Sequence, residues 1–97
     1  MLRHIVMVRF GDKKKAEQHA KEFEDKLLAL LGRIPELKQM EVGLNVNTKP
    51  SAYDLVLIAD FENDTDFNTY RIHPEHLMVV EFMRTVVSET AVVDYYI

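Results

Sequence analysis

With 97 residues and a hydrophobic fraction of 47%, the chain predicts one small domain over residues 1–97, whose core is thin because such a chain buries only about two-thirds of its unfolded surface. The net charge of −4 argues against a nucleic-acid partner, and the lack of cysteine excludes disulfides, thiolate metal sites and a cysteine nucleophile. No apolar run is long enough to cross a bilayer and residues 1–10 lack a signal-peptide pattern, so we expect a cytoplasmic protein with no membrane partner.

A strand and an amphipathic helix are predicted at the start of the chain. Residues Leu2–Phe10 alternate between two faces that are both apolar at the centre, which indicates a strand covered on both sides. Helical spacing of apolar residues around Phe23 predicts a helix over Lys13–Leu31. Asp12 is its expected N-cap, and Gly32 is expected to adopt the left-handed conformation beyond its end.

Two further strands are predicted over Leu37–Val46 and Tyr53–Phe61. The polar segment Asn47–Ala52 joins them, and this pattern is typical of an antiparallel hairpin.

A proline interrupts the second helical stretch. A helix starts at the acidic segment 63–66, and Pro74 then disfavours helix at His73 while suiting the first position of a new helix. We therefore expect a break at His73, a second helix from Pro74 to about Val87 and a last strand over Ala91–Ile97. The expected core stripe of this second helix is Leu77, Val80, Met83 and Val87, widened by Val79, Phe82 and Val86.

The order strand, helix, strand, strand, helix, strand predicts a ferredoxin-like α+β domain, with one antiparallel sheet backed by helices. The helices can cover only one face of this sheet, yet the strands are apolar on both faces. A homodimer that packs sheet against sheet would bury the second face. We therefore expect a homodimeric α/β barrel formed through the sheet faces.

The segment 70–76, Tyr-Arg-Ile-His-Pro-Glu-His, gathers the groups best suited to chemistry near neutral pH. If Tyr70 and His76 converge, His76 could take a proton while Tyr70 hydrogen-bonds a developing enolate or oxyanion. Such a pair suits a reaction at a carbon next to a carbonyl group and requires no cofactor. The competing interpretation is that Tyr70 is a core residue and that His76 packs near the helix start.

The other two histidines of interest have competing roles as well. His73 is the expected N-cap of the second helix, and a ligand-binding role is the alternative. His4 shares a strand face with apolar residues, either as a hydrogen-bonded core residue or facing a pocket in which it meets His76. A metal site is disfavoured, because His73 lies outside the helix and no carboxylate is clearly placed beside it. We assign Tyr70 and His76 as candidate catalytic residues and His4 and His73 as candidate substrate-binding residues, with no metal.

Three segments resemble the Dabb, or stress-responsive alpha/beta-barrel, domain family: residues 3–10, residues 34–37 (Ile-Pro-Glu-Leu) and residues 70–76. The pair Asp94-Tyr95 is also typical of the family. The resemblance spans essentially the whole chain. It implies a ferredoxin-like monomer and a dimer whose two sheets form a barrel.

The resemblance implies less about function, because most members are uncharacterised and a few plant relatives are polyketide cyclases. In those cyclases a tyrosine and a histidine flanking the His-Pro element act in the chemistry, and a first-strand histidine lines the pocket. The resemblance places these roles at Tyr70, His76 and His4.

Three functional hypotheses follow. The first is a protein that binds a small apolar or carbonyl-containing molecule in a pocket between sheet and helices. The second is a cofactor-free cyclase or lyase that uses His76 and Tyr70. The third, by analogy of fold alone, is a haem- or oxygen-dependent monooxygenase.

Overall fold

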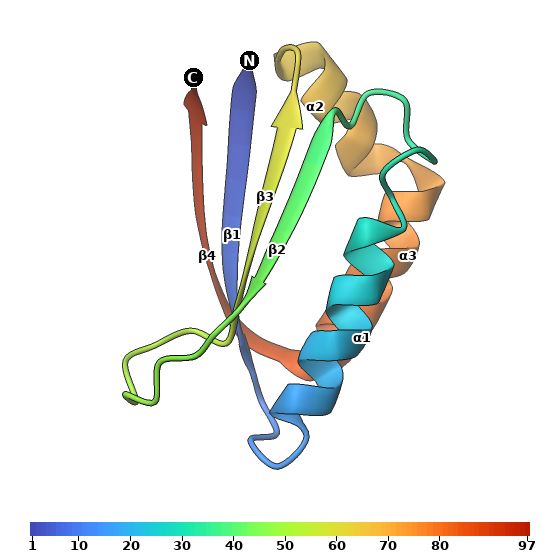
Figure 1. The fold of residues 1–97 in the computed structure, drawn as a ribbon. Helices are drawn as coiled ribbons and strands as arrows, with labels where there is room; N and C mark the ends of the chain where they lie inside the picture. Colours follow the sequence, from blue (N-terminus) through green and yellow to red (C-terminus); the bar gives the residue numbers. More distant parts are fainter.

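A four-stranded antiparallel sheet backed by three helices forms the structure, a computed structural model that describes residues 1–97 (Figure 1). The strands follow the order β2-β3-β1-β4, and all three helices lie on one face of the sheet. This confirms the predicted ferredoxin-like architecture. The elements in chain order are β1 (Leu2–Phe10), α1 (Ala16–Leu28), β2 (Gln39–Leu44), β3 (Leu55–Phe61), α2 (Asp64–Ile72), α3 (Pro74–Val86) and β4 (Val87–Tyr96).

Strand β1 is the centre of the sheet and has the predicted bounds. It pairs with β3 on one side and with β4 on the other, antiparallel in both cases. Its even-numbered residues point toward the helices, where Val6, Val8 and Phe10 are buried in the core. His4 lies on this same face, so its side chain is directed into the space between sheet and helices.

Helix α1 is shorter than predicted at both ends. Asp12 is not its N-cap, because Asp12 Oδ1 accepts a hydrogen bond from the Lys14 amide at 3.0 Å and the helix begins only at Ala16. Consecutive lysines at this end also oppose the helix dipole. At the other end the helix stops at Leu28, and Gly32 then adopts the predicted left-handed conformation with φ 92°.

The boundary between α3 and β4 also differs from the prediction. β4 begins at Val87 rather than at Ala91, with no loop between helix and strand. The Gly11 amide donates to the Val86 carbonyl at 2.9 Å, and Val87 pairs with Phe10 of β1. Pairing with β1 therefore takes Val87, the expected last residue of the helix, into the strand together with residues 88–90.

The buried stripe of α3 is centred on Val79, one of the expected flanking residues, and not on Leu77. Val79 is its buried residue, whereas the expected core residue Leu77 is 48% exposed. Val80 and Met83 are partly buried and contact the pocket described below. The break at His73 sets the rotation of α3, and the sequence pattern alone does not determine that rotation.

The sheet face away from the helices carries ion pairs at its ends and apolar side chains at its centre. Arg3 donates two hydrogen bonds to the Asp60 carboxylate, both at 2.9 Å, and this bonding holds the pKa of Asp60 below its usual range. At the other end Arg9 lies 3.3 Å from Glu89. The apolar centre is formed by Ile5, Met7, Val56, Ile58, Ala91 and Val93.

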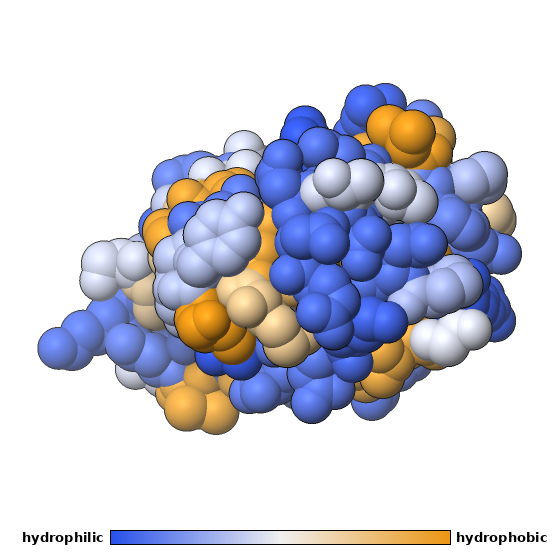
Figure 2. Space-filling model, turned by 90° about the horizontal axis from the view of Figure 1, so that it is seen from above, coloured by the Kyte–Doolittle hydropathy of each residue, from blue (hydrophilic) through white to orange (hydrophobic).

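No helix covers this outer face (Figure 1). Viewed from above, hydrophobic side chains reach the surface between hydrophilic ones on the sheet side of the molecule, at the left of Figure 2. Separately, no helix is both long enough and apolar enough to cross a membrane.

Candidate functional site

The break between α2 and α3 positions the candidate residues. Asn63 caps α2 by accepting a hydrogen bond from the Asp66 amide at 2.9 Å, and α2 ends at Ile72. His73 is extended, with φ −64° and ψ 135°, because the ring of Pro74 disfavours helix at the preceding residue. Helix α3 then starts at Pro74, which suits a first helical position because it has no amide to satisfy.

The two histidines that flank the break hydrogen-bond to the backbone in opposite ways. His73 Nδ1 accepts a hydrogen bond from the Glu75 amide at 3.1 Å and so caps α3, as the sequence predicts. His76 Nδ1 lies 3.0 Å from the Arg71 carbonyl oxygen. A carbonyl oxygen only accepts, so His76 Nδ1 carries a proton and the neutral ring has its lone pair on Nε2.

A pocket of about 210 Å³ brings three of the four candidate residues together. It lies between the sheet and the helices, and β1, β3, β4, α1, α2 and α3 each contribute to its wall. His73 does not line it, because its side chain is engaged in capping α3. The lining residues are His4, Val6, Phe23, Leu27, Leu57, Tyr70, His76, Val79, Val80, Met83, Thr90 and Val92.

Tyr70 is the most deeply buried of the three. Its ring lies 4.9 Å from that of Phe61 and 4.2 Å from that of His76, measured between centroids, and the residue is 2% exposed. Burial raises the pKa of Tyr70 well above its usual value. The hydroxyl therefore keeps its proton at neutral pH and is a hydrogen-bond donor at the pocket.

His76 has the opposite character, since burial favours its neutral form. The pKa of His76 is lowered, chiefly by burial and further by the nearby charges of His4, Arg71 and His73, although the hydrogen bond to the Arg71 carbonyl acts against this shift. At neutral pH the ring is therefore uncharged, with its lone pair on Nε2. This is the state that a general base requires.

His4 is held by a residue that the sequence analysis did not assign to the site. Its Nδ1 lies 2.5 Å from Asp94 Oδ1, and its ring lies 4.7 Å from that of Phe67. Since a carboxylate accepts, the Nδ1 proton lies between the two groups and His4 Nε2 is left for the pocket. Asp94 stands directly opposite His4 in the β1–β4 register, so the pairing of these strands creates the contact.

The pocket lining is mostly apolar, and Thr90 adds a hydroxyl group at the level of Val8, away from His4. The lining residues His4 and Thr90 lie four positions apart along the sheet, because Thr90 pairs with Val8. Four residues of strand span about 13 Å, at roughly 3.3 Å per residue. His4, Tyr70 and His76 gather at one end. The sequence pointed to these three residues because their side chains can take part in acid/base chemistry. The apolar residues that line the rest of the pocket have the same sequence pattern as core residues, so the sequence could not identify them.

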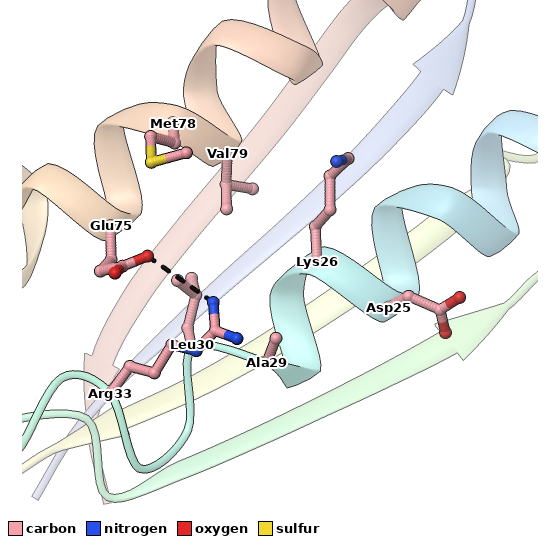
Figure 3. Close-up of a pocket in the computed structure, with 8 residues that line it drawn as sticks. All are labelled: Asp25, Lys26, Ala29, Leu30, Arg33, Glu75, Met78 and Val79. Carbon is pink, nitrogen blue, oxygen red and sulfur yellow. Dashed lines mark ion pairs between the residues drawn. The ribbon is translucent and has the colours of Figure 1, made fainter.

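A second pocket, of about 290 Å³, lies between the C-terminal part of α1 and the start of α3 (Figure 3). Figure 3 shows Arg33 and Glu75 directed toward each other across its mouth, at an N–O distance of 3.7 Å. Four of its eight lining residues are hydrophobic, and Asp25 and Lys26 add further charge to the lining. It contains none of the candidate residues and no histidine or tyrosine for acid/base chemistry. The pocket between sheet and helices that His4, Tyr70 and His76 line, called the sheet-side pocket below, is therefore the candidate site.

The site offers little to a metal ion. No group of three or more His, Cys, Asp or Glu side chains is arranged to hold one. The pocket volume of about 210 Å³ lies below the range of about 300–1,000 Å³ that is typical for drug-sized ligands, and a haem is larger still.

Fold and site together define a ferredoxin-like α/β domain with a histidine–tyrosine pocket between sheet and helices. The chain belongs to the family described as Stress responsive A/B Barrel Domain, which it matches over residues 2–97. This confirms the resemblance drawn from the sequence. No curated protein matches the chain.

Solved structures agree with this assignment. A dimeric protein of unknown function from Bacteroides fragilis is 27% identical, with a TM-score of 0.89 over 99% of this chain and 95% of that one. A hydroxynitrile lyase from Passiflora edulis is 18% identical, with a TM-score of 0.85 over 99% and 92%. An antibiotic biosynthesis monooxygenase is 12% identical, with a TM-score of 0.77 over 100% and 98%. The last two likenesses show the fold alone.

Proposed function

We propose that the protein binds a small, uncharged carbonyl compound in the sheet-side pocket and acts on it as a cofactor-free acid/base enzyme of the cyclase or lyase type. One observation carries this proposal. A neutral histidine with a free Nε2 and a protonated tyrosine line the same pocket, with ring centroids 4.2 Å apart. The alternative is a binding protein that uses the same pocket without catalysis.

The pocket lining supports an uncharged ligand. No lysine, arginine, aspartate or glutamate lines it, and nine of its twelve residues are hydrophobic. An ionised ligand would lose its hydration there without gaining a counter-charge, which is costly. A mostly apolar lining that carries His4, Tyr70 and His76 suits a carbonyl group followed by a short apolar chain.

The proposed reaction begins with proton transfer from a carbon next to the carbonyl group. The proton moves to His76 Nε2, and the electrons of the broken C–H bond form a carbon–carbon double bond while the carbonyl oxygen becomes negative. The Tyr70 hydroxyl stabilises that oxygen by donating a hydrogen bond. The resulting enolate can attack a second carbonyl of the same molecule, which is the cyclase variant.

The lyase variant uses the same groups. The hydroxynitrile lyase from Passiflora edulis shares the fold, and its name supplies a probe. In such a reaction His76 would take a hydroxyl proton, a carbonyl group would form and cyanide would leave. Hydroxynitriles, short ketones and short aldehydes therefore make a suitable panel of test compounds.

The test of the proposal is binding and proton exchange measured on the same panel. We expect at least one compound to shift the ring signals of His76 and Tyr70 in NMR spectra and to exchange the hydrogens next to its carbonyl in D₂O. Binding without exchange would favour the binding-protein alternative. If no compound perturbs either ring at millimolar concentration, the assignment of this pocket fails.

We further propose that the protein is a homodimer that packs its two outer sheet faces together. The apolar centre of this face supports the proposal, and so does the dimeric relative from Bacteroides fragilis. A two-fold axis would place the same apolar patch on both sides of the contact.

A charge at the centre of the outer face should separate the dimer. Val93 lies opposite Ile5 on this face and is 59% exposed in the single chain. We expect the wild type to sediment as a dimer of 11.3 kDa chains at micromolar concentration. Val93→Glu should sediment as a monomer, because the dimer would bury one negative charge from each chain in the same contact. Val46→Glu, at an exposed position outside the sheet, is the control and should stay dimeric. A wild-type monomer would contradict the sheet-to-sheet contact.

A further inference from the structure

The helix break leaves one backbone donor and one backbone acceptor for side chains. In an uninterrupted helix the Glu75 amide would donate to the Arg71 carbonyl, four residues earlier. Here the Glu75 amide donates to His73 Nδ1 at 3.1 Å, and the Arg71 carbonyl accepts from His76 Nδ1 at 3.0 Å. Two histidine side chains thus replace a single backbone hydrogen bond.

The two replacements fix opposite tautomers. An amide only donates, so His73 Nδ1 must be an acceptor and the proton of its neutral ring lies on Nε2. A carbonyl only accepts, so His76 Nδ1 must be protonated. The lone pair of the neutral His76 ring therefore lies on Nε2.

We propose that His73 is a positioning residue, which binds the Glu75 amide and thereby reserves the Arg71 carbonyl for His76. The effect of His73 on the His76 tautomer does not depend on the proposed function, whereas its importance for catalysis does. His73 does not line the pocket, so it acts through His76 and not on the ligand. Its role is to keep the lone pair of His76 on the nitrogen that can accept a proton there.

Other groups around the break do not compete for this carbonyl. Pro74 has no amide, and the His73 amide donates to the Tyr70 carbonyl at 3.1 Å. The Glu75 carboxylate, paired with Arg33 at 3.7 Å, is an acceptor and cannot donate to a carbonyl oxygen. The Glu75 amide is therefore the donor whose release would displace His76 from the Arg71 carbonyl.

The tautomer of His76 can be measured directly by ¹⁵N NMR of the imidazole ring at pH 8, where the ring is neutral. We expect the wild type to carry the proton on Nδ1. His73→Ala removes the acceptor, so the His76 proton should redistribute to Nε2 in part or in full. His73→Asn should restore the wild-type tautomer, because asparagine is a strong N-cap whose Oδ1 can accept the Glu75 amide.

A control variant and a second loss variant complete the design. His19→Asn changes a histidine of α1, away from the break, and should leave His76 on the wild-type tautomer. If His73→Ala fails to fold, His73→Leu is used instead, because leucine fills the space without offering an acceptor. The His76 proton should then redistribute to Nε2, as expected for His73→Ala.

Two outcomes would overturn the inference. One is a His76 proton that stays on Nδ1 in the folded loss variant. The other is an asparagine variant that fails to restore the tautomer, since the cap would then not be what matters. Neither outcome depends on finding a substrate, so a failure of the proposed function would show separately in the exchange assay.

Discussion

Replacing Phe23 with alanine is expected to lower the free energy of unfolding by about 3–5 kcal/mol. Phe23 is 1% exposed, and it packs edge-on against Phe10 and against the tilted ring of Phe82, with centroids 6.4 and 6.1 Å away. It joins α1 to both β1 and α3. Truncation would enlarge the neighbouring pocket rather than let it collapse, because the two rings around Phe23 are anchored on two different elements, β1 and α3.

The measurement is urea unfolding of both proteins at one fixed concentration, since dissociation of a dimer would contribute to the apparent stability. Leu28→Ala is the matched control. Leu28 lies in the same helix but is 43% exposed, so its loss should cost less than about 1 kcal/mol. An equally small loss for Phe23→Ala would remove this residue from the core.

The topology could be predicted because local signals agree with the final structure. The alternation of Leu2–Phe10 has the period of a strand, and the apolar spacing around Phe23 has the period of a helix. Pro74 supplied the break between α2 and α3, and His73 the cap. Each of these features depends on residues close together in the sequence.

The misplaced boundaries depend on contacts between distant parts of the chain. β4 starts at Val87 because that residue meets Phe10 of β1, and valine is common in both helices and strands. The α1 start moved to Ala16 because Asp12 bonds locally to the Lys14 amide instead of capping a helix there. Periodicity alone cannot weigh these competing hydrogen bonds.

The candidate site shows the same division. The chemistry of Tyr70 and His76 marked them in the sequence, but their approach across the break depends on the rotation of α3. Asp94 was noted in the sequence only as part of a family-typical pair and was not assigned to the site, because its contact with His4 arises from the register of β1 and β4. Residue type therefore suggested the candidate functional residues, and the tertiary structure determines which of them lie close together.

Replacing His76 with asparagine is expected to lower the rate of the proposed reaction by about 10²–10⁴-fold, the usual contribution of a general base. Asparagine is the sharpest replacement, because its side-chain amide can still donate to the Arg71 carbonyl but offers no base in place of Nε2. The start of α3 should therefore be preserved. Tyr70→Phe is the companion variant, which removes the oxyanion donor and keeps the ring that packs against Phe61.

The pH dependence of the rate separates a base from a merely structural histidine. Burial lowers the pKa of His76 from the ordinary 6.5, so the ring stays neutral at pH 7 and loses its lone pair only under more acidic conditions. The wild-type rate should thus be level from pH 7 to pH 8 and should fall as the pH drops through a pKa below 6.5. The residual rate of His76→Asn should lack this fall. A rate that still rises between pH 7 and pH 8, or an asparagine variant with the wild-type profile, would mean that another group takes the proton.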